Sequence, residues 1–204
     1  MASETFPVSG LKNCTWTKAW RQTSQITGGG GGGGIEMGDP YWMISCVYEN
    51  LTEAQFRAVT AFIGRRNGNL VPFRAYRSDR QNPINIPNAG ALSPSITEIT
   101  AGVMQITTGT LKLAEGDMVA YRSSAGARFV GEIDELLSSQ TNSVQCRMIP
   151  FAPTPNGTPD LQIYRAEGLF MLIPESVSPN EPYDKKRSIS FSARQLEKPF
   201  TEPA

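Results

Sequence analysis

Not one of the 204 residues is a histidine. Histidine is the commonest general base in enzymes, it activates serine and cysteine nucleophiles, and it is a frequent metal ligand. The three cysteines, Cys14, Cys46 and Cys146, are widely separated and follow no metal-binding or redox spacing. We expect all three to be reduced and mostly buried. These shortages leave few routes to catalysis or to a metal centre.

The charges of the chain balance, with 19 basic and 19 acidic residues and a formal net charge of zero. A chain without net positive charge has no general electrostatic attraction for nucleic acid or for an anionic membrane. No apolar run is long enough to span a membrane, and the first residues do not resemble a secretory signal. We therefore expect neither a membrane partner nor a signal peptide.

The motifs of common catalytic sites are also missing. The sequence contains no Gly-x-Ser-x-Gly elbow, no paired cysteine motif and no calcium loop with alternating acidic residues. Glu132 and Asp134 would share one face of a strand, the arrangement that a catalytic carboxylate pair requires. A solvated polar face of a half-buried strand is the commoner arrangement, and we predict it here. The sequence thus predicts no catalytic residue, no cofactor, no metal and no enzyme activity.

Glycine and proline, in contrast, are abundant, with 19 and 15 residues. Such a composition indicates many turns and short strands rather than a helical bundle. We predict a mainly β protein, a sandwich or split barrel with one principal α-helix, plus an inserted small antiparallel β-barrel-like module. Apolar and β-branched runs of strand length predict strands at 15–26, 35–48, 71–76, 103–108, 117–122, 127–133, 143–149, 161–166, 168–173 and 187–193.

The principal helix is predicted from its end signals. Thr52 offers an N-cap oxygen, and Gln55, three residues later, completes a capping box. Leu51 and Phe56 flank this cap as a hydrophobic staple. Gly68 is suited to the left-handed conformation that ends a helix. Val59, Phe62 and Ile63 place apolar side chains on one face of the helix. Arg65 and Arg66 are the two basic residues of its last turn.

Seven consecutive glycines, Gly28 to Gly34, separate two predicted strands. A polyglycine segment does not hold a fixed conformation by itself, because glycine loses the most backbone entropy on ordering. The run indicates a flexible hairpin tip, with a loop that orders against a neighbouring subunit as the alternative. A phosphate-binding loop is not indicated, since Ile-Glu-Met follows the run in place of Gly-Lys-Ser.

Two proline-rich segments, 86–94 and 151–159, divide the chain. Between them, in 95–150, short predicted strands alternate with turn signals at a spacing typical of a small antiparallel barrel. We predict that residues 1–85 and 160–204 form one discontinuous domain, and that 95–150 is a module inserted between its halves. The two proline-rich segments would be the linkers.

Several motifs together suggest a family. A hairpin rich in Ser, Thr and Gly precedes the sequence Tyr-Trp-Met, and a helix with Ala61-Phe62 at its core is followed by Gly68 and Phe73. The middle segment carries Gly116-Asp117 among its short strands. These features, together with the closing strand at 189–196, resemble the distal tail proteins of long-tailed bacteriophages.

The resemblance implies a structural virion protein. Such a protein forms a ring, commonly a hexamer, that joins the tail tube to the tip or baseplate and leaves a channel for DNA. The implied partners are other copies of the chain, the tail tube protein and the tail-tip hub or baseplate proteins. DNA would pass through the lumen without specific binding. The implied location is the tail tip of the virion, after assembly in the host cytoplasm.

Under this resemblance, the glycine run and the arginines that follow the helix are expected to face other subunits. The predicted subunit-interface residues are Gly28, Gly31, Gly34, Arg65, Arg66, Arg74 and Arg77. An alternative for the arginines, which alternate with aromatic residues, is contact with nucleic acid or with an acidic partner.

A function of a different class also fits the sequence, that of a soluble carbohydrate- or ligand-binding β-module protein. Aromatic side chains are the usual stacking platforms for sugar rings. The candidates in this chain are Trp16, Trp20, Tyr41 and Trp42.

Overall fold

The structure is a computed structural model of the chain. It describes residues 4–26, 32–68, 70–86, 89, 94–100, 103–107, 113–123, 128–139, 143–150, 154–155, 161–180 and 186–196, with the backbone alone at 22–26, 32–39 and 98–100. Within these ranges it contains ten strands and one α-helix, and that helix falls short of what crossing a membrane requires.

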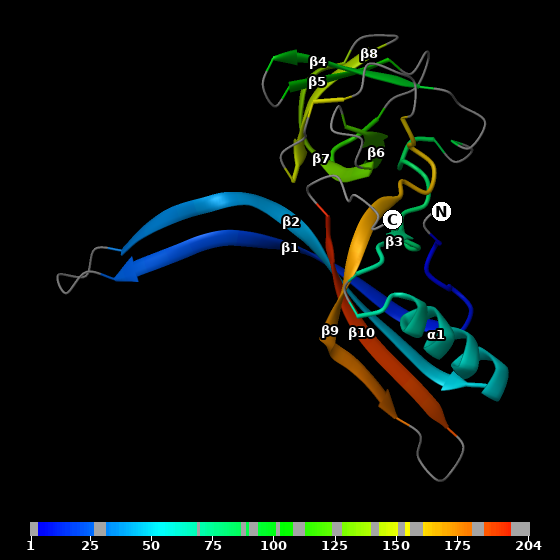
Figure 1. Cartoon of the computed structure of the whole chain (residues 1–204). Coiled ribbons are helices and arrows are strands. Elements are labelled where there is room, and N and C mark those ends of the chain that lie inside the picture. Colours follow the sequence, from blue (N-terminus) through cyan, green and yellow to red (C-terminus); the bar gives the residue numbers. More distant parts are fainter. Residues whose placement is uncertain are drawn as a thin grey trace.

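The first sheet is antiparallel and has the strand order β1-β2-β10-β9-β3. Both ends of the chain contribute to it, because β10, near the C-terminus, pairs with β2, near the N-terminus (Figure 1). The bounds of its strands are β1 Leu11–Ile26, β2 Gly32–Leu51, β10 Arg187–Gln195, β9 Gly168–Asn180 and β3 Phe73–Ala75.

The helix α1 (Glu53–Arg65) packs against β2 and β10 of this sheet. The predicted capping box is confirmed, since the Thr52 hydroxyl accepts from the Gln55 amide and the Gln55 side chain accepts from the Thr52 amide. The end of the helix differs from the prediction. Arg66 is the C-cap, and the first residue with positive φ is Asn67, at 46°, with Gly68 following at 68°. Asparagine tolerates this conformation better than most residues.

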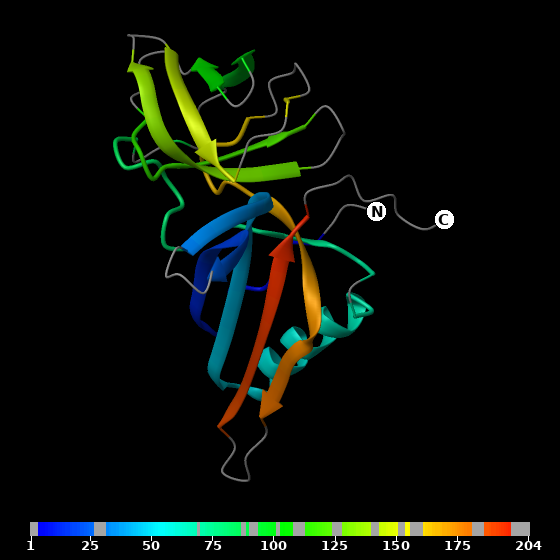
Figure 2. The ribbon, with the colours of Figure 1, turned by 90° about the vertical axis from the view of Figure 1, so that its left-hand side faces the viewer.

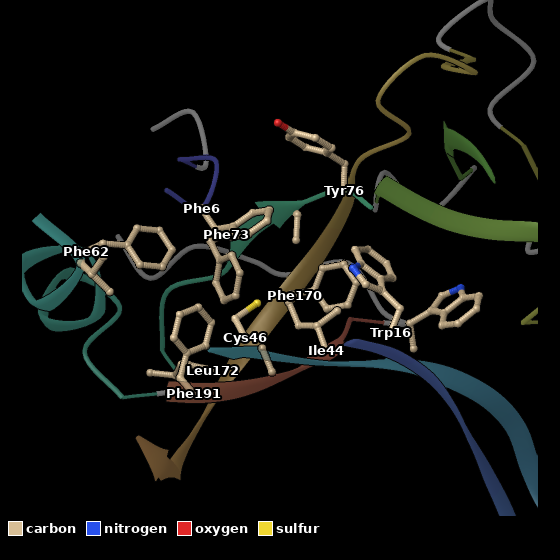
Figure 3. Packing of buried hydrophobic residues seen from close by; sticks show 14 of the residues in the cluster. Phe6, Trp16, Ile44, Cys46, Phe62, Phe73, Tyr76, Phe170, Leu172 and Phe191 are labelled. Carbon is tan, nitrogen blue, oxygen red and sulfur yellow. The ribbon is translucent and has the colours of Figure 1, made fainter. Parts of the chain in front are cut away.

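Aromatic rings fill the space between α1 and the first sheet (Figure 3). Phe62 of α1 packs edge-on against Phe73 of β3, with ring centroids 5.3 Å apart. Phe191 of β10 lies 6.1 Å from Phe73, also edge-on, and Phe170 of β9 lies 5.1 Å from Trp16 of β1. These edge-to-face arrangements are the favourable ones for aromatic pairs. Every strand of the sheet thus contributes to one core.

The second sheet has the strand order β4-β5-β8-β7-β6 and is also antiparallel. It curls into a barrel-like shape above the first sheet (Figure 2). The predicted fold class, mainly β with one principal helix and a small antiparallel barrel-like module, is confirmed. The bounds are β4 Ser95–Thr100, β5 Val103–Thr107, β6 Met118–Arg122, β7 Arg128–Ser139 and β8 Ser143–Ile149.

The second sheet has a core of its own, and its members extend past the predicted module boundaries. Ile86 and Ala89 were assigned to a linker, and Leu161 and Ile163 to the outer halves, yet all are buried in this second cluster. Three residues of the second sheet are in turn buried within the first cluster, Met118, Ala120 and Val130. The two sheets therefore pack directly on one another.

Several strands differ in extent from the prediction. β4 was not predicted, β1 and β2 begin before residues 15 and 35, and β7 continues past residue 133 to Ser139. Residues 161–166 do not form a strand. Only Gln162 pairs there, with Ala120. β3 is shorter than the predicted 71–76, and β9 continues past its predicted end at residue 173 to Asn180. β9 is longer than predicted because β10 pairs with it as far as Asn180. A bulge next to Ile173 accommodates Pro174, which has no amide N–H to donate to the ladder.

Candidate functional site

The largest projection from the body is an arm formed by the far ends of β1 and β2 (Figure 1). We call residues 20–26 and 32–40 the arm. Its two strands stay in antiparallel register to the pair Ile26 and Gly32. The register shifts between the pairs Ala19–Tyr41 and Arg21–Gly38 and again before Gln22–Glu36, so the irregularity of β2 lies at Gly38-Asp39-Pro40, where glycine and proline also weaken a strand. A bulge keeps the ribbon continuous while bending it.

Neither edge of the arm has a described strand beside it, because β10 pairs with β2 only from Met43 to Leu51. Among the described strands β1 pairs only with β2, so the outer amides and carbonyls of β1 face away from the sheet. Trp20, at the base of the arm, is 53% exposed, an unusual state for a tryptophan. Tyr41 is half-buried beneath Arg21, whose guanidinium lies 4.9 Å from the ring centroid. An open strand edge next to an exposed tryptophan is a typical protein-binding surface.

One of the three glycines predicted to face other subunits lies in this arm. Gly34 lies in β2 and pairs with Ser24 of β1. Gly28 and Gly31 lie outside the described residues. Gly34 is therefore part of a strand ladder rather than of a loop.

Arg65 and Arg66 lie together at the end of α1, but they differ in exposure. The Arg65 side chain is 54% exposed and that of Arg66 only 4%, although both bind the carboxylate of Glu4, at 2.7 and 2.6 Å. Arg66 also donates to the carbonyl oxygens of Phe62 and Pro72. Burial lowers the pKa of Arg66 from its usual value, and the Glu4 charge opposes this effect. Arg66 thus holds the chain together and has little surface left for a neighbour.

Arg74 and Arg77 do not join those two arginines in one basic surface. Arg74, in β3, lies 3.8 Å from the carboxylate of Glu167. Arg77 is mostly buried and binds Asp79 at 2.8 Å. Burial would raise the pKa of Asp79, but the hydrogen bond and charge of Arg77 and the charge of Arg80 lower it. Each predicted arginine is therefore paired with an acid of its own chain.

A polar cavity of about 470 Å³ lies where the segment after β3 meets the second sheet. Arg80 donates to the carbonyl of Gly116, 3.1 Å away, and approaches the Glu132 carboxylate at 3.4 Å. Glu132 also pairs with Lys18 of β1, at 3.4 Å. The cavity is lined by Asp79, Arg80, Asn82, Ile84, Glu115, Gly116, Asp117, Met118 and Glu132.

Asp117 is the most buried carboxylate of this cavity, at 5% exposure. It accepts hydrogen bonds from the amides of Ile84, at 2.8 Å, and Ala114, at 2.7 Å. Burial raises the pKa of Asp117, while these two bonds and the charge of Arg80 act in the opposite direction. In the described part of the chain no group of three or more acidic or cysteine side chains is placed to hold a metal. The hydrogen bonds of Arg80 and Asp117 therefore hold the segment 79–84 against β6 and β7.

Glu132 and Asp134 lie in different environments. Asp134 is exposed, whereas Glu132 is mostly buried in its ion pairs with Lys18 and Arg80. The predicted solvated polar face is therefore correct for Asp134 and wrong for Glu132. The reason is tertiary, because β1 and the segment after β3 bring two cations to one carboxylate.

The aromatic residues considered as sugar platforms are mostly inside the protein. Trp16 and Trp42 are 8% and 2% exposed and pack edge-on with centroids 5.9 Å apart. Trp20 alone of the three tryptophans is exposed. Sequence reasoning did not single out Glu4, whose partners Arg65 and Arg66 lie 61 and 62 positions away in the chain. No protein-family model matches this chain, and no curated protein matches it significantly.

Proposed function

We propose that this protein is a structural component of a phage tail tip. Copies of the chain would form a ring that joins the tail tube to the tip or baseplate and surrounds a channel for DNA. The observation that carries the proposal is the arm, a two-stranded ribbon that leaves the body with the outer edge of β1 open. The resemblance of the sequence to distal tail proteins supplies the biological setting.

The arm supports an assembly because it is poorly suited to existing alone in water. An isolated two-stranded hairpin is marginally stable, and an open strand edge tends to pair with another chain. If the arm of one copy docks on a different surface of the next, the contact is head-to-tail and closes into a ring when the rotation permits. Trp20 is the described side chain best suited to anchor this contact.

The role is architectural and needs no cofactor. The cavity carboxylates Asp117 and Glu132 accept hydrogen bonds or form ion pairs within the chain. The balanced charge of the chain agrees with a channel that lets DNA through without specific binding. The partners are other copies of the chain, the tube protein and the hub or baseplate proteins, at the tail tip of a virion assembled in the host cytoplasm.

Size-exclusion chromatography with light scattering, followed by negative-stain imaging, tests the assembly. We expect rings, commonly hexamers. Trp20→Asp is expected to weaken the assembly by roughly thirtyfold or more, the effect of a hot-spot residue. The matched control is Leu137→Asp, a change of another exposed apolar residue, 40% accessible and in β7 of the second sheet, which should leave rings intact. A strictly monomeric protein that never joins a purified tail contradicts the proposal.

A carbohydrate-binding role retains one observation in its favour, the exposure of Trp20. A glycan array separates the two functions, because a sugar platform at Trp20 predicts a signal from the monomer that Trp20→Ala abolishes. Rings without any glycan signal support the tail-tip function instead.

A further inference from the structure

The ladder between β1 and β2 brings two cysteines together that are far apart in the sequence. Cys14 lies directly opposite Cys46 in the antiparallel register. Directly opposite residues of an antiparallel pair point to the same face of the sheet. The two Sγ atoms are accordingly in contact, at 2.6 Å. The chain spacing had suggested three unrelated thiols, and the register overturns this for two of them.

The backbone around this pair is regular. The register runs without a shift from the pair Asn13–Val47 to the pair Ala19–Tyr41, so Cys14 and Cys46 lie within an undistorted stretch. Opposite residues in such a ladder have Cα atoms about 4.5–5.5 Å apart, within the roughly 4.4–6.8 Å that a disulfide spans. Joining the two sulfurs therefore requires no movement of the strands.

The surroundings of the two thiols differ in a way that sets an order of reaction. Cys46 is fully buried in the interior strand β2, next to Phe191 of β10. Cys14 is only partly buried, because β1 is the edge strand. The hydrogen bond with Cys14, then burial, raise the pKa of Cys46 well above its usual range. A reagent from solvent thus meets Cys14 first.

We propose that Cys14 and Cys46 form a redox site that closes to an intramolecular disulfide by exchange with a small-molecule disulfide such as oxidised glutathione. The Cys14 thiolate attacks one sulfur of the reagent, which forms a mixed disulfide and releases one thiolate. Cys46 loses its proton to solvent and attacks the Cys14 sulfur, which releases the second thiolate. Two protein thiols and one small disulfide become one protein disulfide and two small thiols. This site does not rest on the proposed ring.

The bond ties the edge strand to its only described strand partner. β1 has no neighbour on its other side among the described strands, so it is the strand of the first sheet most open to fraying. A covalent link to the interior strand β2 restricts the unfolded chain and holds β1 in place. For a protein of this size we expect the unfolding temperature to rise by roughly 5–10 °C on oxidation.

The test uses the full chain, reduced and then treated with oxidised glutathione under native conditions. Alkylation in denaturant followed by mass spectrometry should count one free thiol, Cys146, and a protein mass lower by two hydrogen atoms. Peptide mapping without reductant should join Cys14 to Cys46. Cys14→Ser should prevent the cross-link and remove the difference in unfolding temperature between treated and untreated protein, whereas Cys146→Ala should retain both.

Three outcomes overturn the inference. The first is three free thiols after treatment. The second is a stable glutathione adduct on Cys14 that Cys46 does not displace. The third is a cross-link between two chains or one that includes Cys146. Because wild-type protein alone distinguishes these outcomes, the test stands even if a cysteine variant folds poorly.

Discussion

The side-chain amide of Gln195 donates a hydrogen bond to the carbonyl oxygen of Val130, 2.8 Å away. Gln195 ends β10 of the first sheet, and Val130 lies in β7 of the second. The other end of the same side chain accepts from the amide of Trp42, at 3.3 Å. Gln195 is 4% exposed, so neither bond is readily replaced by water. One buried glutamine therefore links the two sheets.

Gln195→Leu should lower the free energy of unfolding by about 1–3 kcal/mol. The apolar side chain removes both bonds and leaves buried polar groups of the backbone with fewer partners. Urea unfolding measures the effect. Asn13→Ala, which truncates an exposed amide side chain in β1, should change stability by no more than about 0.5 kcal/mol. Equal losses in the two variants would show that the Gln195 bonds do not stabilise the fold.

Gly168→Ala should destabilise the protein by about 1–3 kcal/mol through overpacking. A Cβ at this position would lie 2.3 Å from Cγ1 of Val130, across the contact between the sheets. The matched change Gly64→Ala meets nothing within 4 Å, and on an exposed helical position it should stabilise by about 0.5–1 kcal/mol.

The clash at Gly168 also predicts a rescue. In a background of Val130→Ala, the change Gly168→Ala should cost much less than in the wild type, since the opposing methyl groups are gone. Thermal or urea unfolding of all four proteins gives the coupling energy. Additive effects would mean that the two residues do not touch.

Phe62→Ala should lower the free energy of unfolding by about 3–5 kcal/mol. Phe62 is 1% exposed and contacts the rings of Phe73 and Phe191, so its removal leaves a cavity between α1 and the sheet. Thr60→Ala, on the exposed face of the same helix, is the control and should be nearly neutral. A loss below about 1 kcal/mol for Phe62→Ala would place this helical face elsewhere.

Arg66→Ala should cost about 2–4 kcal/mol, and Arg65→Ala less than about 1 kcal/mol. Both arginines bind Glu4, but only Arg66 is buried and bonded to two backbone carbonyls. Exposed ion pairs contribute little, whereas buried donors that leave acceptors unsatisfied are costly to remove. Chemical denaturation of the two variants side by side compares them, and a similar loss from both would argue against the burial of Arg66.

Asp117 should make the protein less stable as the pH rises. Its pKa in the folded state lies above the ordinary 3.8, chiefly because it is buried. The folded state therefore holds this proton more tightly than the unfolded state does. The protonated Asp117 contributes its full share of the folding stability below the unfolded-state pKa, and this share is lost as the pH rises through the folded-state pKa. Asp117→Asn removes the titration at the cost of one backbone hydrogen bond, which is a constant offset.

Urea unfolding of wild type and Asp117→Asn across this acidic range measures the difference between them. The stability of the wild type relative to the variant should fall with rising pH. A difference that is independent of pH, or that grows in favour of the wild type, would contradict the raised pKa.

Local interactions made α1 predictable. The capping box of Thr52 and Gln55, and the buried face at Phe56, Val59 and Phe62, depend on residues three or four positions apart, so a short segment contains all the information. The alternation of apolar residues likewise located β8 and most of β2 and β10. The lengths of β3 and β9 were not local, because a neighbouring strand determines where pairing stops.

The arginines show the limit of sequence reasoning most clearly. Arg65 and Arg66 are adjacent and chemically identical, and both were predicted to face a neighbouring subunit. The backbone of Arg74 in β3 forms hydrogen bonds with Glu4 and Phe6 of the N-terminal segment. These bonds bring the Glu4 carboxylate to both arginines, and only Arg66 is buried there.

The amino-acid sequence alone determined the fold class, the capped helix and the scarcity of catalytic groups, because composition and short-range periodicity express these properties directly. The tertiary structure decided which side chains are available. It placed Trp16 and Trp42 in the core and Trp20 at the surface, and it set Cys14 against Cys46. Those outcomes depend on the order and register of strands far apart in the chain, as in the Ser192–Ser45 pair of β10 and β2, 147 positions apart, which no local pattern encodes.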